Sequence, residues 1–274
     1  MRIGFFALVL LAVAGCETIP QDSPELTLDP VIGKPAPGTL ELAERAIGEH
    51  RFADAKKLLD RVLLAEPANM KARLVLAELQ LASGFPKPAA AVFGALVDDP
   101  DVGARALQGL GIASVLNGDT REGYESLSKA VEQDPGLWRA WNALGYYHDT
   151  ERDWAAADEN YDKALAANPG SALILNNRGY SRLMQQRLEE AIEDFNRALA
   201  IDRDFELAQE NLRLALAWKG KYVHAMAGAT NTNMGRILNN IGFIAILRGD
   251  YENAESYLLR AMEADPSFNE VASR

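Results

Sequence analysis

Small and large apolar side chains recur along this chain at a fixed interval of 34 residues. Repeats can be started at residues 36, 70, 104, 138, 172, 206 and 235, where only the last step is shorter, by five residues. Seven repeats then cover residues 36–268. Such self-similarity predicts an array of supersecondary units. The twentieth position is small in every repeat: Ala55, Ala89, Gly123, Ala157, Ala191, Ala225 and Ala254.

Three further positions of the repeat support the same register. The eighth position is small in every repeat except the sixth, which has Arg213, and the twenty-seventh is Ala in the clearer repeats. Proline stands at the thirty-second position as Pro67, Pro135, Pro169 and Pro266. Small residues let two helices approach closely, and proline ends the second helix. Each repeat is therefore predicted to be an antiparallel helical hairpin.

The pattern departs from this register in two places. After Ala225, residues 228–233 contain Gly, Ala, Thr and Asn, are poor in helix formers and lack the proline. We expect a short or irregular second helix in the sixth repeat. Residues 269–274 form a short tail after the seventh repeat, where an exposed apolar end needs a cap or a partner.

The N-terminus has the pattern of an export signal. Arg2 is followed by an uncharged run over residues 3–14, which is shorter than the ~20 residues that span a bilayer. Residues 13–16 read Val-Ala-Gly-Cys. Residues 1–15 are therefore predicted to be a signal peptide, and residues 16–38, with five prolines after Cys16, a tether. The alternative is an ordinary secretory signal followed by an unrelated cysteine.

Composition narrows the classes of function. A net charge of −11 argues against binding to nucleic acid or to anionic lipid. One cysteine and three scattered histidines give no disulfide, CxxC or zinc pattern. No nucleotide-binding or hydrolase motif occurs. We therefore expect a protein-binding chain without catalysis, cofactor, metal or small-molecule substrate; an enzyme using a carboxylate site among the many acidic residues is the remote alternative.

The fourth repeat carries the fullest motif: Trp141, Leu144 and Gly145 in the first half, then Ala157, Tyr161, Ala164 and Pro169. This resembles the tetratricopeptide repeat (TPR). The resemblance implies an all-α fold, a right-handed superhelical α-solenoid of about seven helix-turn-helix repeats. It also implies that the first helices line a groove that binds peptides through repeat positions two, five, six, nine and twelve.

Asparagines and aromatic residues occupy these groove positions in the later repeats. A carboxamide can pair with the backbone of an extended peptide, aromatic rings supply apolar contact, and arginines can hold a carboxylate. The alternative is that the asparagines form hydrogen bonds between repeats or face water. The candidate groove residues are Asn177, Asn211, Asn240, Asn142, Asn176, Asn239, Tyr146, Tyr180, Phe243, Arg139 and Arg236.

The leader and the C-terminal half carry two finer resemblances. The Val-Ala-Gly-Cys16 ending is similar to a bacterial lipobox, which implies lipidation of Cys16, and Glu17 favours the outer over the inner membrane. The leader, the tether and the stretches 175–212 and 238–245 resemble the TadD family of TPR lipoproteins of the tight-adherence (Flp) pilus system. This resemblance implies a role in assembling or localising a secretin. An adaptor for peptidoglycan hydrolases and a type IV pilus pilotin like PilF remain alternatives.

Overall fold

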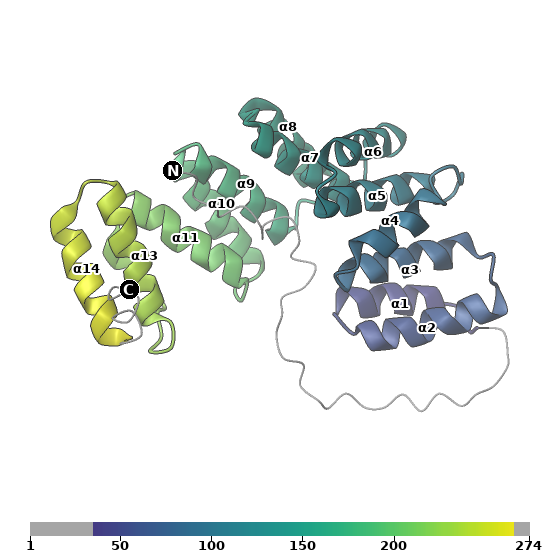
Figure 1. The fold of residues 1–274 in the computed structure, drawn as a ribbon, viewed down its shortest axis with the longest axis horizontal. Helices are drawn as coiled ribbons and strands as arrows, with labels where there is room; N and C mark the ends of the chain where they lie inside the picture. Colours follow the sequence, from purple (N-terminus) through teal and green to yellow (C-terminus); the bar gives the residue numbers. More distant parts are fainter. Residues whose placement is uncertain (1–34, 266–274) are drawn as a thin grey trace. The chain divides into compact units, whose positions relative to one another are not determined.

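A computed structural model describes residues 35–265 of the chain. The predicted signal peptide, the predicted lipidation site Cys16, most of the predicted tether and the tail 269–274 lie outside the described residues. Within the described part all regular structure is helical, and helices follow one another in pairs separated by short turns (Figure 1). The predicted all-α class of stacked helical hairpins is confirmed.

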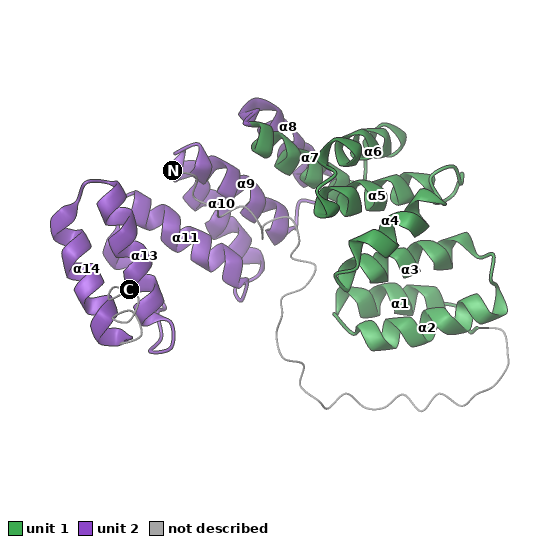
Figure 2. Cartoon of the chain, viewed as in Figure 1, with its two compact units in different colours: residues 1–151 green, residues 152–274 purple. Residues whose placement is uncertain are grey.

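The described residues form two compact units, divided after Glu151 (Figure 2). The first unit contains three complete hairpins and the first helix of the fourth. Its helices are α1 (Thr39–Gly48), α2 (Phe52–Ala65), α3 (Met70–Ala82), α4 (Pro86–Gly94), α5 (Gly103–Asn117), α6 (Thr120–Gln133) and α7 (Trp138–Glu151).

The second unit begins with the second helix of the fourth hairpin and contains the next three hairpins. Its helices are α8 (Trp154–Ala167), α9 (Ala172–Met184), α10 (Leu188–Ile201), α11 (Glu206–Trp218), α12 (Tyr222–Ala225), α13 (Met234–Leu247) and α14 (Tyr251–Ala264).

The small eighth position of the repeat allows the two helices of a hairpin to touch. A Cβ atom added to Gly179 in α9 would lie 2.8 Å from the ring of Phe195 in α10. The same addition to Gly242 in α13 would lie 2.7 Å from the side chain of Leu258 in α14. Distances below 3.0 Å are excluded for real Cβ atoms without movement of a neighbour. At these two positions only glycine fits without movement of the large residue of the second helix.

The sixth hairpin differs from the others because its second helix is shortened to a single turn. Its second helix, α12, has only four residues. The eighth position carries Arg213, whose Nη2 atom donates to the carbonyl oxygen of Ala227 at 3.5 Å in the segment that follows α12. The long arginine side chain thus reaches toward a region where the other hairpins place a second helix.

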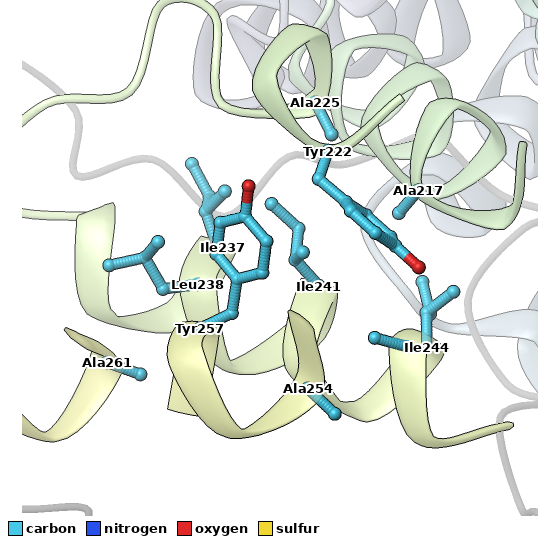
Figure 3. Close-up of a cluster of buried hydrophobic side chains, with 11 residues drawn as sticks. Ala217, Tyr222, Ala225, Ile237, Leu238, Ile241, Ile244, Ala254, Tyr257 and Ala261 are labelled. Carbon is cyan, nitrogen blue, oxygen red and sulfur yellow. The ribbon is translucent and has the colours of Figure 1, made fainter. Parts of the chain in front are cut away.

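The core of the C-terminal hairpins extends across four helices (Figure 3). Tyr222 of α12, Ile241 and Ile244 of α13, and Tyr257 of α14 belong to one buried cluster. The rings of Tyr222 and Tyr257 meet edge to face, with centroids 5.5 Å apart. Although α12 is only one turn long, its aromatic side chain is 6% exposed and its hydroxyl donates to Asp250 at 2.9 Å. The stub is therefore held by the hairpin that follows it.

Candidate protein-binding surface

The asparagines of α9 and α11 are buried and bonded to one another. Asn176, Asn177 and Asn211 are 0%, 2% and 4% exposed. Asn211 donates its Nδ2 hydrogen to Oδ1 of Asn176 at 2.9 Å, and Asn176 donates to Oδ1 of Asn177 at 3.3 Å. A buried amide that lost its partner would leave polar atoms desolvated and unsatisfied. For Asn176 and Asn211 the contacts support the alternative of a hydrogen bond between repeats.

The candidates on α13 are more accessible. Asn239 and Asn240 are half-buried, Phe243 is 49% exposed, and Arg236 is exposed. Arg236, Asn240 and Phe243 follow one another at spacings of four and three residues, so they share one face of the helix. Arg236 pairs with Glu210 of α11 at 2.7 Å, and both side chains are about half exposed. A carboxylate that binds Arg236 would have to compete with Glu210.

The remaining groove candidates are separated between the two units. Asn142, Tyr146 and Arg139 lie on α7 of the first unit, where Asn142 is buried and Tyr146 is half-buried. Tyr180, also half-buried, lies on α9 of the second unit. Arg139 stacks over the ring of Trp138, with its guanidinium carbon 4.5 Å from the ring centroid. Desolvation lowers the pKa of Arg139, and the nearby carboxylate of Glu78 opposes that shift.

A row of charged side chains that was not predicted from the sequence lies on the first helices of the first unit. Arg105 of α5 donates to Glu78 of α3 at 2.8 Å and to Glu44 of α1 at 3.1 Å. Burial raises the pKa of the Glu78 carboxyl, and the charge of Arg105 opposes the shift. Glu44 and Glu78 occupy the ninth position of their repeats, and Arg105 and Arg139 the second. The signal was therefore present in the same positions that pointed to the asparagines.

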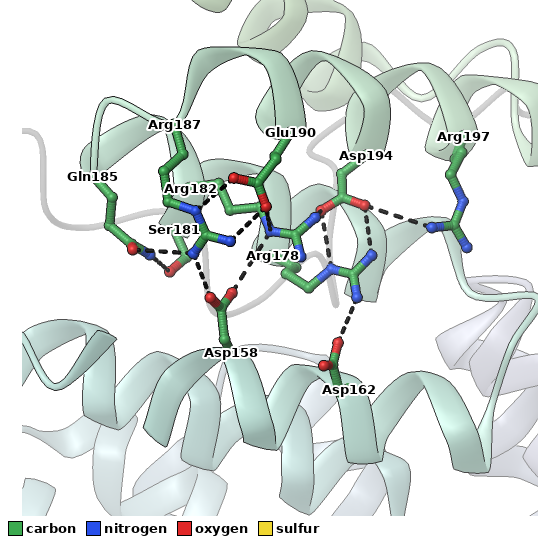
Figure 4. Close-up of polar contacts among 10 residues, drawn as sticks. All are labelled: Asp158, Asp162, Arg178, Ser181, Arg182, Gln185, Arg187, Glu190, Asp194 and Arg197. Carbon is green, nitrogen blue, oxygen red and sulfur yellow. Dashed lines mark hydrogen bonds and ion pairs between the residues drawn. The ribbon is translucent and has the colours of Figure 1, made fainter. Parts of the chain in front are cut away.

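A second charged group lies inside the second unit (Figure 4). The carboxylate of Asp194 in α10 is 1% exposed and accepts from both Arg178 and Arg182 of α9, each with one contact of 2.6 Å. Arg178 also donates to Asp162 of α8 at 2.5 Å. Arg187, which bonds Asp158 of α8 and Glu190 of α10, has its pKa raised by those two hydrogen bonds. Arginines of α9 thus join the acidic faces of α8 and α10.

The printed contacts of these groups join neighbouring helices. Over residues 35–265, no group of three or more His, Cys, Asp or Glu side chains is arranged to hold a metal ion. None of the helices described is long and apolar enough to cross a membrane.

Comparison with solved structures finds the same fold. A TPR protein from Thermus thermophilus is 21% identical, with 69% of this chain and 97% of that chain covered and a TM-score of 0.56. A TPR protein from Parabacteroides merdae is 16% identical, with 83% and 92% covered and a TM-score of 0.52. PilF of Pseudomonas aeruginosa is 18% identical, with 84% and 91% covered and a TM-score of 0.51.

The family comparison agrees with the fold. No curated protein matches the chain. Profiles described as tetratricopeptide repeat match residues 46–110, 142–206 and 235–268, which together span more than half of the sequence. The third match has the bounds of the seventh repeat. Repeats of this kind are generally non-catalytic and imply a scaffold for protein–protein interaction. The chain belongs to the tetratricopeptide repeat family.

Proposed function

We propose that this protein is a lipid-anchored scaffold that binds an extended polypeptide along the first helices of its second unit. The observation that carries the proposal is the row of Arg236, Asn240 and Phe243 on one face of α13. It offers a cation, a carboxamide and an aromatic ring, of which Arg236 and Phe243 are about half exposed. An extended peptide presents carbonyl and amide groups to such a carboxamide, and side chains to the ring.

The proposed cellular role is to assist assembly or localisation of a secretin of a tight-adherence (Flp) pilus at the outer membrane. Its support is the resemblance of the leader, of Cys16 and of the stretches 175–212 and 238–245 to the TadD family. The fold shared with PilF is compatible with this role, but that fold is common to TPR proteins of many functions. A hydrolase adaptor and a type IV pilotin are therefore kept as outcomes of the experiment.

The test is affinity purification of the protein from solubilised cell envelopes. The variant Arg236→Glu/Asn240→Ala changes the proposed contact residues, while Arg121→Glu makes the same charge change on α6, where the side chain is 92% exposed. We expect the secretin to co-purify with wild type and with Arg121→Glu, and to be lost with the double variant. Recovery of murein endopeptidases without secretin, recovery of a type IV pilus secretin in place of the Flp secretin, or a secretin yield that the double variant leaves unchanged, would contradict the proposal.

The lipid anchor is tested separately. Cys16→Ser removes the thiol that would be acylated, and each buried CH₂ of an acyl chain contributes ~0.8 kcal/mol to membrane binding. We expect the variant to move from the membrane fraction to the soluble periplasmic fraction with an unchanged melting temperature. A variant that stays with the membrane would show that Cys16 is not the anchor.

A further inference from the structure

The last hairpin ends in a surface that we call the end face, formed by Phe243 and Ile246 of α13 and by Tyr251 and Glu252 of α14. These residues occupy positions 9, 12, 17 and 18 of the seventh repeat. The same positions of the fifth repeat are Tyr180, Leu183, Leu188 and Glu189. The two repeats therefore carry side chains of the same kind, which are aromatic or aliphatic at positions 9, 12 and 17 and a carboxylate at position 18.

In the fifth hairpin these positions are covered by the next first helix, α11. Tyr180, Leu183 and Leu188 belong to one apolar cluster with Leu212, Ala215 and Trp218 of α11. Leu183 is only 5% exposed as a result.

The edge of that contact carries an ion pair. Lys219, which directly follows α11, pairs with Glu189 through a 2.6 Å contact. The covering helix therefore has apolar residues three apart, followed immediately by a base.

In the last hairpin the equivalent residues are open. Phe243 is 49%, Ile246 41% and Tyr251 69% exposed. Within the described part of the chain, no basic side chain lies within ion-pair distance of Glu252. Leu247 is not part of this difference between the two hairpins. It is 46% exposed, and Met184, at the same position of the fifth repeat, is 47% exposed. Exposure of Ile246 thus reflects the lack of a covering helix among the described residues, whereas exposure of Leu247 is ordinary for its position.

We infer that the end face binds an amphipathic helix of a partner protein, one with apolar residues spaced like Leu212, Ala215 and Trp218 and a base placed like Lys219. The inference follows from continuity with the contact between the fifth and sixth hairpins, which shows what covers these positions. Charge supports a basic helix, since Glu252 and its exposed neighbour Glu255 lie on α14 without an ion pair to any described residue. The inference shares Phe243 with the proposed groove, but it does not depend on peptide binding there or on the pilus role, and the residues changed in its test lie outside that row.

A second copy of this chain is a poorer occupant for two reasons. Its first helix, α1, carries Arg45 at the tenth position, where α3 has Leu79 and α11 has Ala215, so head-to-tail stacking would place a cation against the apolar face. Contact between two end faces would bring the carboxylates Glu252 and Glu255 of both copies together. Each copy also has a net charge of −11.

The probe is a fluorescent peptide of residues 203–219, which contains α11 and Lys219, titrated with the purified full chain and followed by anisotropy. We expect saturable binding that Ile246→Glu weakens about tenfold or more, because a charge replaces a central apolar contact. Leu259→Glu is the matched control, since Leu259 is 54% exposed on α14 at the position of the exposed Asn196. It should bind the peptide like wild type. Tyr251→Glu serves in place of Ile246→Glu if the latter does not melt cooperatively.

Charge reversal tests the proposed ion pair between Glu252 of the chain and Lys219 of the peptide. Glu252→Lys should weaken binding of this peptide and strengthen binding of a peptide carrying Lys219→Glu. Absence of saturable binding, equal affinity for wild type and Ile246→Glu, or no response to charge reversal would overturn the inference. Binding that appears only after removal of residues 266–274 would also overturn it, because the chain's own C-terminal residues would then be the occupant. A dimer of the chain that Ile246→Glu dissociates would overturn it as well, because the occupant would then be a second copy.

Discussion

The fifth and sixth hairpins differ in what holds them together. In the fifth, Gly179 lets Phe195 of a 14-residue second helix pack against α9, and Asp194 joins the same two helices through buried ion pairs. In the sixth, the second helix is a single turn, Arg213 replaces the small residue, and Tyr222 anchors the stub to the following hairpin. A complete hairpin is stabilised by its own two helices, and a truncated one depends on its neighbour.

The largest effect is expected when Asp194 is replaced by Ala. The substitution leaves Arg178 and Arg182, whose side chains are 10% and 15% exposed, without their shared carboxylate. Breaking a buried pair by removing one partner costs about 3–5 kcal/mol. Urea unfolding should show that loss for Asp194→Ala and a change within about 0.5 kcal/mol for Glu193→Ala, its exposed neighbour. Equal effects would show that the ion pairs do not join the helices.

The next largest effect is a loss of stability from substitutions at the eighth position, which we compare between the two hairpins. Gly179→Val places a branched side chain against Phe195, and such overpacking costs about 1–3 kcal/mol. Arg213→Val meets no second helix and should cost less than about 1 kcal/mol. The two melting curves measured side by side test the comparison directly. A larger loss at Arg213 would mean that its long side chain takes over the role of the missing helix.

A smaller effect is expected from Tyr222→Phe. The change keeps the ring in the apolar cluster and removes only the hydrogen bond to Asp250, which contributes about 1 kcal/mol. Hydrogen exchange of the amides in residues 222–229 should speed up, while exchange in α10 stays unchanged. Faster exchange in both segments would contradict the local role assigned to this bond.

The smallest effect is a pH dependence at the same contact. Hydrogen bonds from Asn253 and then Tyr222 lower the pKa of Asp250 below its ordinary value. Stability from this group is therefore present at neutral pH and is lost as the pH falls from about 4 through the lower folded-state pKa. The difference in melting temperature between wild type and Tyr222→Phe should narrow in that range. A difference that stays constant down to pH 2 would rule out an ionised Asp250 as the acceptor.

The fold was predictable because close packing leaves a regular trace in the sequence. Wherever a large residue of the second helix meets the first, as Phe195 meets Gly179, the eighth position is small. The shortened second helix of the sixth repeat could be predicted for the same reason, because the repeat pattern is interrupted after Ala225. The surfaces were harder to predict, because a repeat position does not show whether an asparagine faces a groove or a neighbouring helix. Asn176 and Asn211, at repeat positions five and six, were both candidates for the groove, and they bond to each other.

The charged group between α8, α9 and α10 could have been found from its spacing. Asp158 and Asp162, Arg178 and Arg182, and Glu190 and Asp194 each stand four residues apart on successive helices. A basic stripe lying between two acidic stripes predicts ion pairs. This arrangement was not predicted, because the acidic residues were considered only for their net charge and for a carboxylate-based catalytic site.

Residues at one position of the repeat are expected to have the same surroundings wherever a neighbouring hairpin covers them. Hydroxyl-radical footprinting of the full chain, read by mass spectrometry, measures this for matched side chains in one experiment. We predict fast oxidation of Phe243 and Tyr251 and slow oxidation of Tyr180 and Leu188, after correction for the intrinsic reactivity of each residue type. Equal protection of the two sets would contradict the account, because the end face would then be covered within the chain itself.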